Sequence, residues 1–253
     1  MRALLDHPLV LLPVSLAILW LATRLGTAIR AWRVPQNEVR REDFDIVLGA
    51  TLTLLCLIVG FSFSMAANRY DQRKNYEEGE ANAIGTAYAR ADLLPAADAM
   101  KVHSLFREYI DLRVRFYTTV DYQQRRDIYR TTGRSQAQLW AAVVAPTSAN
   151  PTPVAALVVS SMNDVLNAQG YAQAAVWNRI PIGAWVLLYT IGFVAAALIG
   201  FQFRTESRQR VLMLVLPVLI AISLFLIADI DCPRGGAILV VPQNLMALAA
   251  AIG

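Results

Sequence analysis

The residues best placed to do chemistry lie within an apolar segment. Thr53, Leu57 and Phe61 recur every four residues, which places them on one face of a helix, and Gly60 and Ser64 lie close to that face. A pore for a poorly hydrated ion needs hydroxyl or backbone dipoles and a narrow apolar constriction, and these residue types supply both. Close helix packing is the simpler interpretation of the same small residues. A single copy encloses nothing, so the pore interpretation requires an oligomer.

Asp229 and Asp231 form a second candidate site, because they end the last apolar block and precede a proline and two glycines. Acids at a membrane boundary suggest cation binding or gating. Solvation at the membrane surface, or pairing with Arg234 or Arg69, explains them without such a function. We assign Arg69, Asp229 and Asp231 structural or gating roles.

A third group of acids, Glu77, Glu78 and Glu80, follows the second apolar block and could attract cations. Arg73 precedes Glu77, and Lys74 precedes Glu78, at the four-residue spacing of helical ion pairs. We therefore expect solvated surface acids here.

Other chemistry finds little support in the sequence. The only histidines are His7 and His103, and the two cysteines, Cys56 and Cys232, are poorly placed to pair. No nucleophile with its base, phosphate loop or metal-ligand spacing is present, so we expect no enzyme, no cofactor and no metal. The 23 Lys and Arg are interleaved with 19 Asp and Glu, which favours contacts with membrane lipids and no nucleic-acid partner.

The composition places most of the chain in a bilayer. Of 253 residues, 56% are hydrophobic and 17% are charged, and the mean hydropathy is +0.42, which excludes an ordinary soluble enzyme, a disordered chain and a fibre. Charges are almost absent from four blocks, Leu9–Ala22, Ile46–Ala67, Pro181–Phe203 and Val211–Ala228. We expect an all-α integral membrane protein with four transmembrane helices and a helical extramembrane domain inserted between the second and third.

The first block is short for a span and is either an uncleaved anchor or a signal peptide, of which its flanks favour the anchor. We expect an interfacial helix after it, ending at Pro35, with Arg24, Arg30 and Arg33 placed to reach lipid headgroups. Gly192, Ala196 and Gly200 predict a close helix-packing seam. The last two blocks form a hairpin whose tip carries Arg204, Glu206, Arg208 and Arg210.

Residues 68–180 are patterned as helices. The second span continues as one helix to Leu94, and Pro95 stops it. A third helix covers residues 122–145, residues 146–153 form a loop, and Pro153 opens the last helix. Between them, a helix carries an apolar stripe that needs a partner helix, made of Val102, Leu105, Phe106, Tyr109, Leu112 and Phe116.

These elements define four expected domains: two spans with an interfacial linker (1–67), the helical extramembrane domain (68–180), the transmembrane hairpin (181–228) and a C-terminal segment (229–253). The C-terminal segment begins with Asp-x-Asp-x-Pro-x-Gly. Its apolar tail is too short to span, so it docks on the protein or lies at the membrane surface.

Three segments, Gly60–Arg73, Glu78–Thr86 and Asp231–Gly235, resemble the bestrophin-like family of bacterial integral membrane proteins. Similarity to the bestrophin anion channels is more distant and rests on Gly60-Phe61, Arg69-Tyr70 and a Pro-x-Gly after the last span. The resemblance implies a multi-pass protein of the bacterial inner membrane, a pentamer, and a chloride-type pore lined by the second span.

By register, the resemblance implies that Thr53, Leu57 and Phe61 line the neck of this pore, although Thr53 departs from a fully hydrophobic ring. Gly236-Ala237-Ile238 replaces the acidic calcium clasp of animal bestrophins, so calcium gating is not implied. The resemblance also implies a cytoplasmic helical domain, whereas eight bases near the short loops against six on the other face favour an extracytoplasmic one. The side stays open.

The sequence thus favours an oligomeric channel for small anions, with Thr53, Leu57, Gly60, Phe61 and Ser64 lining its pore. The alternative is a non-conducting membrane scaffold or sensor whose helical domain binds a partner. Ion flux and subunit number distinguish the two.

Overall fold

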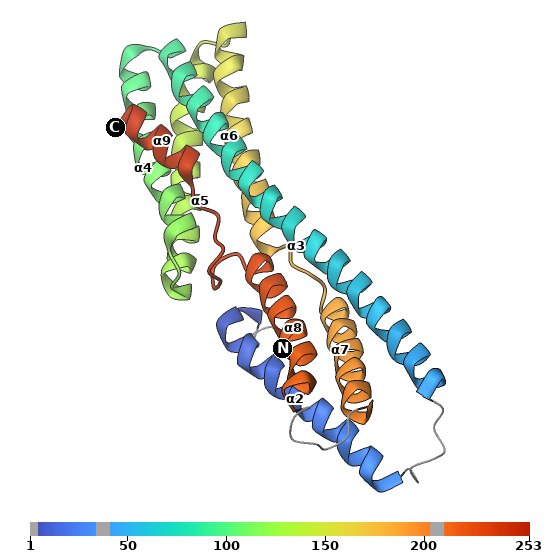
Figure 1. Cartoon of the computed structure of the whole chain (residues 1–253). Helices are drawn as coiled ribbons and strands as arrows, with labels where there is room; N and C mark the ends of the chain where they lie inside the picture. Colours follow the sequence, from blue (N-terminus) through green and yellow to red (C-terminus); the bar gives the residue numbers. More distant parts are fainter. Residues whose placement is uncertain (1–4, 34–40, 203–209) are drawn as a thin grey trace. The chain divides into compact units, whose positions relative to one another are not determined.

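The computed structural model describes residues 5–33, 41–202 and 210–253, which are helices and turns without any strand. The predicted all-α class is confirmed for these residues. The helices are α2 (Pro8–Arg33), α3 (Arg41–Arg90), η1 (Ala91–Leu93), α4 (Ala96–Thr118), α5 (Tyr122–Ala149), α6 (Pro153–Trp177), α7 (Ile182–Gln202), α8 (Arg210–Asp231) and α9 (Gln243–Ile252), as labelled in Figure 1.

Within the described residues, four helical segments are long and apolar enough to cross a membrane: Pro8–Trp32, Phe44–Leu93, Pro153–Gln202 and Met213–Asp231. They overlap the four apolar blocks of the sequence, so the expected number of spans is supported by length and composition. The expected loop residues Pro35, Arg204, Glu206 and Arg208 lie outside the described residues.

The chain divides into two compact units. Unit 1 comprises residues 1–69 and 179–239, and unit 2 comprises residues 70–178 and 240–253. The boundary falls within α3, which runs as one helix of 50 residues. The C-terminal helix α9 therefore belongs to the unit formed by the middle of the chain.

Unit 1 is built around close contact of α2 with α7. A Cβ atom added to Gly26 would lie 1.9 Å from the carbonyl oxygen of Ala197, and one added to Gly200 would lie 1.9 Å from that of Thr23. Ala196, between the two predicted seam glycines of α7, is fully buried. The packing seam expected on α7 is confirmed, and Gly26 is its counterpart on α2.

The segment expected to form an interfacial helix is the second half of α2, which continues without a break to Arg33. The Nη1 atom of Arg30, expected to contact lipid headgroups, instead contacts the protein. That atom donates to the carbonyl oxygens of Phe201 (2.7 Å) and Gln202 (2.8 Å) at the end of α7. The last carbonyl groups of a helix lack intrahelical partners. Arg30, a residue of α2, therefore caps the C-terminus of α7.

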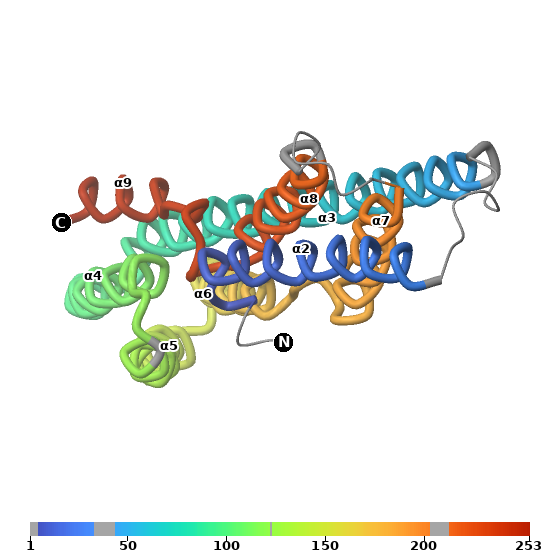
Figure 2. The backbone as a smooth tube through the Cα atoms, turned by 60° about the horizontal axis from the view of Figure 1, so that its bottom comes forward, coloured from blue at the N-terminus to red at the C-terminus, as the bar shows by residue number. Residues whose placement is uncertain are grey.

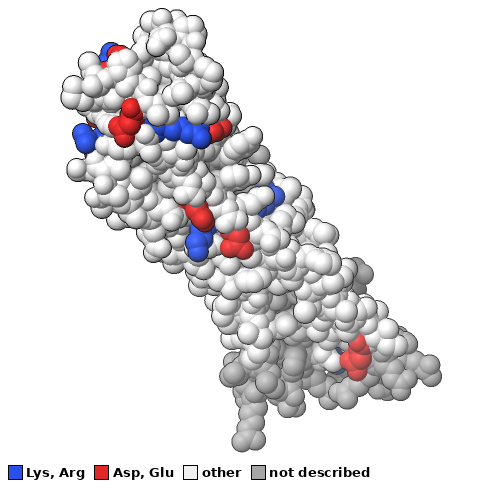
Figure 3. Space-filling view, turned by 90° about the horizontal axis from the view of Figure 1, so that it is seen from above, with Lys and Arg blue, Asp and Glu red and all other residues white. Residues whose placement is uncertain are grey.

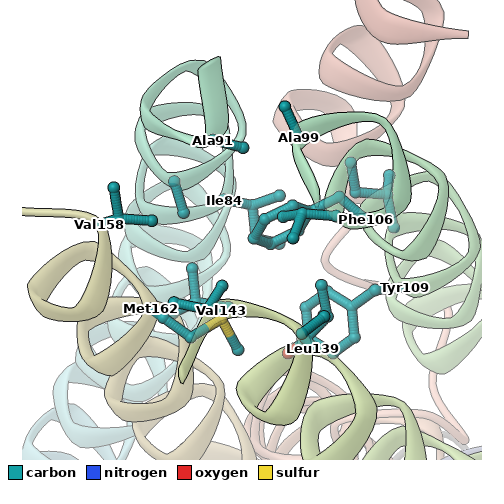
Figure 4. Packing of buried hydrophobic residues seen from close by; sticks show 14 of the residues in the cluster. Ile84, Ala91, Ala99, Phe106, Tyr109, Leu139, Val143, Val158 and Met162 are labelled. Carbon is teal, nitrogen blue, oxygen red and sulfur yellow. The ribbon is translucent and has the colours of Figure 1, made fainter. Parts of the chain in front are cut away.

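The core of unit 2 lies where α3, α4, α5 and α6 meet. Figure 4 shows Phe106 beside Ile84, and Tyr109 of α4 beside Leu139 of α5. The apolar stripe of α4 thus packs against partner helices, as predicted; Leu139 itself is fully buried. Figures 1 and 2 both show α4 and α5 side by side.

The loop predicted at residues 146–153 is too long. Helix α5 continues through Pro146 to Ala149, because a proline removes only one helical hydrogen bond and the preceding turn is held in the core by buried Val143. Pro153 begins α6 as predicted, and the Thr152 hydroxyl caps it by accepting from the Ala155 N–H (3.0 Å).

The tail docks on the protein, one of the two options left by the sequence. Leu245 at the start of α9 is fully buried in the unit 2 core. Leu248 lies where a Cβ atom on Gly85 of α3 would meet it at 3.4 Å. Arg107 of α4 donates from Nε to the Ile252 carbonyl (2.8 Å) at the far end of the tail.

Candidate pore face and polar contacts

Within unit 1, α3 buries one side. The buried residues are Leu48, Leu55, Ser62 and Ala66, with exposed fractions of 9%, 4%, 3% and 0%. Their spacings of seven, seven and four residues keep them on one side of an α-helix. The opposite side of this helix is therefore the exposed one.

The five predicted pore residues share that exposed side: Thr53, Leu57, Gly60, Phe61 and Ser64. Leu57 is 52% exposed and Phe61 is 64% exposed. A Cβ atom added to Gly60 would meet no described atom within 4 Å. The Thr53 hydroxyl donates to the carbonyl four residues earlier (2.9 Å), so its proton is satisfied within the helix while its residue stays exposed. We call this side of α3 the pore face.

The same side of α3 becomes polar past residue 64. Asn68, Asp71, Asn75, Glu78 and Asn82 are all exposed and follow one another at spacings of three or four residues. Of these, the sequence marked only Glu78 as a residue that could attract ions, as part of an acidic cluster. The seven-residue spacing of the buried side could have identified the others. Once that side is known, the remaining positions of this long helix can be assigned to the opposite side.

The expectation of surface acids is wrong for Glu77, which is 1% exposed. Its Oε1 accepts from the Leu245 N–H (2.9 Å), and its Oε2 accepts from the Asn244 side-chain amide (2.8 Å). The first N–H groups of a helix lack intrahelical partners and carry partial positive charge. Glu77 therefore caps α9 from a distance of 168 residues in sequence.

Glu80 is fully buried as well, beside Arg113 of α4. Arg113 donates to the Glu80 carboxylate from Nε, and from Nη2 at 3.1 Å. Tyr117 donates to the same carboxylate (3.4 Å), and the guanidinium carbon lies 4.2 Å from the ring centre of Phe116. Because the surroundings are apolar, the attraction between Glu80 and Arg113 is the main compensation for the cost of removing both charges from water.

The charge pair affects neighbouring ionisation. Burial is the largest single effect and works against the charge of Arg113. Attraction and hydrogen bonding to Glu80, with smaller effects of Tyr109 and Tyr117, together outweigh it and raise the pKa of the guanidinium. Burial, and then the Glu80 charge, raise the pKa of Tyr109. Both groups keep the protonation states they have at neutral pH, so this network is structural.

Asp229 is 1% exposed, so it is not solvated at a surface. Its two carboxylate oxygens accept from the backbone N–H groups of Ala237 (2.7 Å) and Ile238 (2.9 Å). A Cβ atom on Gly236 would lie 2.6 Å from Asp229 Oδ1, so a glycine is required inside this turn. The carboxylate therefore fastens the chain that leaves α8.

Asp231 is buried to the same extent and joins the starts of α2 and α7 to the end of α8. It accepts from the Ile180 N–H (3.1 Å) and lies 3.5 Å from Arg179 Nε. Arg179 also donates to the Leu5 carbonyl (2.9 Å) and pairs with Asp6. Sequence reasoning missed Arg179 as a partner, because only the fold brings these segments together.

Among the described residues, no group of three or more His, Cys, Asp or Glu is arranged to hold a metal ion. Both cysteines are free; Cys56 is exposed, and the sulfur of Cys232 accepts from the Gly235 N–H (3.2 Å). On the side shown in Figure 3, Lys and Arg side chains lie beside Asp and Glu side chains instead of forming one basic stripe.

The sequence profile of the Bestrophin-like domain matches residues 9–245, which is nearly the whole chain. The chain belongs to the bestrophin-like family. Among curated proteins, no sequence matches it.

Solved structures support the bestrophin-like fold. A variant of a bacterial bestrophin homologue from Klebsiella pneumoniae is 14% identical with a TM-score of 0.64, and the match covers 95% of this chain and 93% of that one. A second variant of that homologue is 14% identical with a TM-score of 0.62, covering 97% and 96%. A structure described only as a membrane protein is 12% identical with a TM-score of 0.63, covering 94% and 98%. At these identities the similarity concerns the fold.

Proposed function

We propose that the protein is an oligomeric channel for small anions in the inner membrane of a bacterium, with α3 of each copy lining a central pore. The observation that carries this proposal is the pore face. In one copy it exposes glycine, threonine and serine together with a large leucine and phenylalanine, which is an unusual surface for contact with lipid tails. Around a symmetry axis, the same residues form rings.

In this arrangement the four spans cross the bilayer, and the helical domain is inserted between the second and third. Rings of Leu57 and Phe61 form the apolar constriction, and Thr53 supplies hydroxyl oxygens on one side of it. Gly60 and Ser64 leave room beside the phenylalanine ring. Five copies are the number implied by resemblance to the bestrophins.

Arg69, Asp229 and Asp231 have roles around this pore. Arg69 follows the apolar part of α3 and lies beside the pore face, about 80° around the helix from Phe61, where its positive charge attracts anions towards the pore. Asp229 and Asp231 hold the chain breaks beside α7 and α8 through the backbone N–H groups described above. They support the spans and need no contact with the ion.

The experiment is anion flux into liposomes containing the purified protein, with the subunit number measured on the same preparation by native mass spectrometry. Phe61→Ala should change chloride flux while leaving the subunit number unchanged. Phe63→Ala is the matched control, because Phe63 is also exposed (41%) but lies about 160° away from Phe61 around the helix, outside the pore face. A monomer or dimer without flux, or equal effects of both variants, contradicts the proposal.

The alternative function is a non-conducting scaffold or sensor whose helical domain binds a partner. It is favoured by exposed apolar side chains near η1 and the start of α6: Leu93 (49%), Met100 (68%), Val154 (47%) and Leu157 (48%). Apolar side chains gathered on a surface mark interaction sites. If the protein lacks flux, Leu157→Asp should abolish binding of that partner without altering assembly.

A further inference from the structure

We infer that the end of unit 2 formed by the start of α5 and the end of α6 is a docking surface for an anionic phospholipid membrane. The surface consists of Arg126, Arg130, Tyr129, Trp177 and Val120. We call it the basic aromatic end. The inference is independent of whether the protein conducts ions.

Contacts between α5 and α6 show that these residues lie at one end of the unit. The rings of Tyr129 and Trp177 are 6.5 Å apart, and farther along the two helices Gln136 donates to Gln169 (3.3 Å). As the residue number rises on α5 it falls on α6, so the two helices are antiparallel. The start of α5 and the end of α6 therefore share one end of unit 2.

Chain connectivity places this end close to the start of the apolar helix α7. Trp177 is the last residue of α6, and the apolar helix α7 begins five residues later at Ile182. An extended chain covers about 3.5 Å per residue, so Trp177 lies within about 18 Å of the start of a span.

A ring contact between α6 and α3, the helix that carries the second span, gives a second argument. The rings of Tyr76 on α3 and Tyr171 on α6 are stacked with centres 5.8 Å apart. Trp177 lies six residues past Tyr171, and Tyr70 lies six residues before Tyr76, directly after the apolar part of α3. Arg90 of α3 donates to the Leu157 carbonyl of α6 (3.3 Å), so these two helices are antiparallel. Six helical residues advance about 9 Å along each helix, so Trp177 lies level with Tyr70, which directly follows the apolar part of α3.

The chemistry of the basic aromatic end matches a phospholipid headgroup layer. Trp177 is 67% exposed, Val120 62% and Tyr129 48%, although large apolar side chains are normally buried. Trp and Tyr favour the membrane interface because their rings are apolar at one end and polar at the other. Three exposed apolar groups at the level of the headgroups are covered once they enter that layer.

The charge at this end selects anionic lipids. Arg126 and Arg130 are both exposed and stand one helical turn apart. Arg130 has a weak contact with Asp127 (3.8 Å, with side chains 59% and 74% exposed), and Asp121 is used as the cap of α5, where it accepts from the Gln124 N–H. Arg115 and Arg125 add two further bases, so four arginines stand against two acids between residues 115 and 130. Phosphate accepts hydrogen bonds from guanidinium in a fork geometry.

The test uses the full-length protein in detergent micelles, titrated with phosphatidylglycerol or phosphatidylcholine of equal chain length and read by native mass spectrometry. The unmodified protein should retain phosphatidylglycerol preferentially. Each base near an anionic surface contributes about fivefold to binding, so Arg126→Gln/Arg130→Gln should reduce that preference about tenfold or more. Raising the salt concentration should reduce it further in the unmodified protein.

Two controls make the result decisive. Lys101→Gln removes an exposed base near the start of α4, at the opposite end of unit 2, and should leave the preference unchanged. Arg126→Lys/Arg130→Lys keeps the charge and should retain most of the preference. Equal preference in the glutamine and unmodified proteins overturns the inference, as does equal loss in the lysine variant, which would indicate packing instead of charge. Helix content and elution volume confirm that each variant is folded.

Discussion

Replacing Glu80 by glutamine should destabilise unit 2 far more than its small change in shape suggests. The carboxylate is fully buried and faces the Arg113 guanidinium, whose side chain is 1% exposed. Glutamine keeps an oxygen for one hydrogen bond but leaves a buried positive charge without its counter-charge. Removing one partner of a buried ion pair costs about 3–5 kcal/mol, and we expect the lower end of this range because one hydrogen bond survives.

The assay is guanidinium unfolding of the full-length protein in detergent micelles, followed by circular dichroism. Glu108→Gln is the matched control, because Glu108 is an exposed acid on α4, and its replacement should cost less than about 0.5 kcal/mol. Glu80→Leu/Arg113→Met removes both charges and should recover stability to within about 1 kcal/mol of the unmodified protein. A cost below about 1 kcal/mol for Glu80→Gln would refute the assignment of Glu80 as the main compensating charge.

Three further outcomes follow from the described contacts. Gly200→Ala places a Cβ atom 1.9 Å from the Thr23 carbonyl oxygen, so thermal unfolding in micelles should show a loss of at least about 2 kcal/mol, whereas Gly79→Ala, in open space, should show none; similar effects would contradict the α2–α7 seam. If Glu78 faces the pore, its ring repels anions, so Glu78→Gln should shift the reversal potential towards greater chloride permeability, and an unchanged potential would place it elsewhere. Because the folded pKa of Tyr109 is raised above its ordinary value of 10.0, stability present below pH 10 is lost above it; unfolding measured against pH should show a smaller loss for Tyr109→Phe, and an equal loss would refute its burial.

The periodicity of apolar residues predicted the all-helical class and the buried side of α4, although it ended α5 four residues too early. Three of the four apolar blocks have about the twenty residues that the bilayer imposes on a span, and α2 extends the short first block to a helix of 26 residues. The stripe from Val102 to Phe116 indicates a helix with one buried side, and the structure buries it. The spacing of Thr53, Leu57 and Phe61 likewise places them together on α3, because residues four apart share a helix face whatever surrounds the helix.

Polar residues were harder to place from sequence, because their environment depends on distant segments. Glu77 and Glu80 have the local spacing of solvated ion pairs, yet their partners lie on α9 and α4. Arg30 lies next to an apolar block as a headgroup contact would, yet it caps α7. No local pattern contains this information.

What the sequence by itself determined is the membrane-spanning, all-helical class and the two faces of α3, since both follow from local repetition of residue type. Only the tertiary structure decided which acids are buried and that Gly26 of α2 packs against α7. Both results depend on which helices approach one another. It also brought Tyr129 to Trp177 across 48 residues and so created a surface that neither segment shows alone. Side-chain pairing over such separations is set by helix packing, and helix packing is a property of the folded chain.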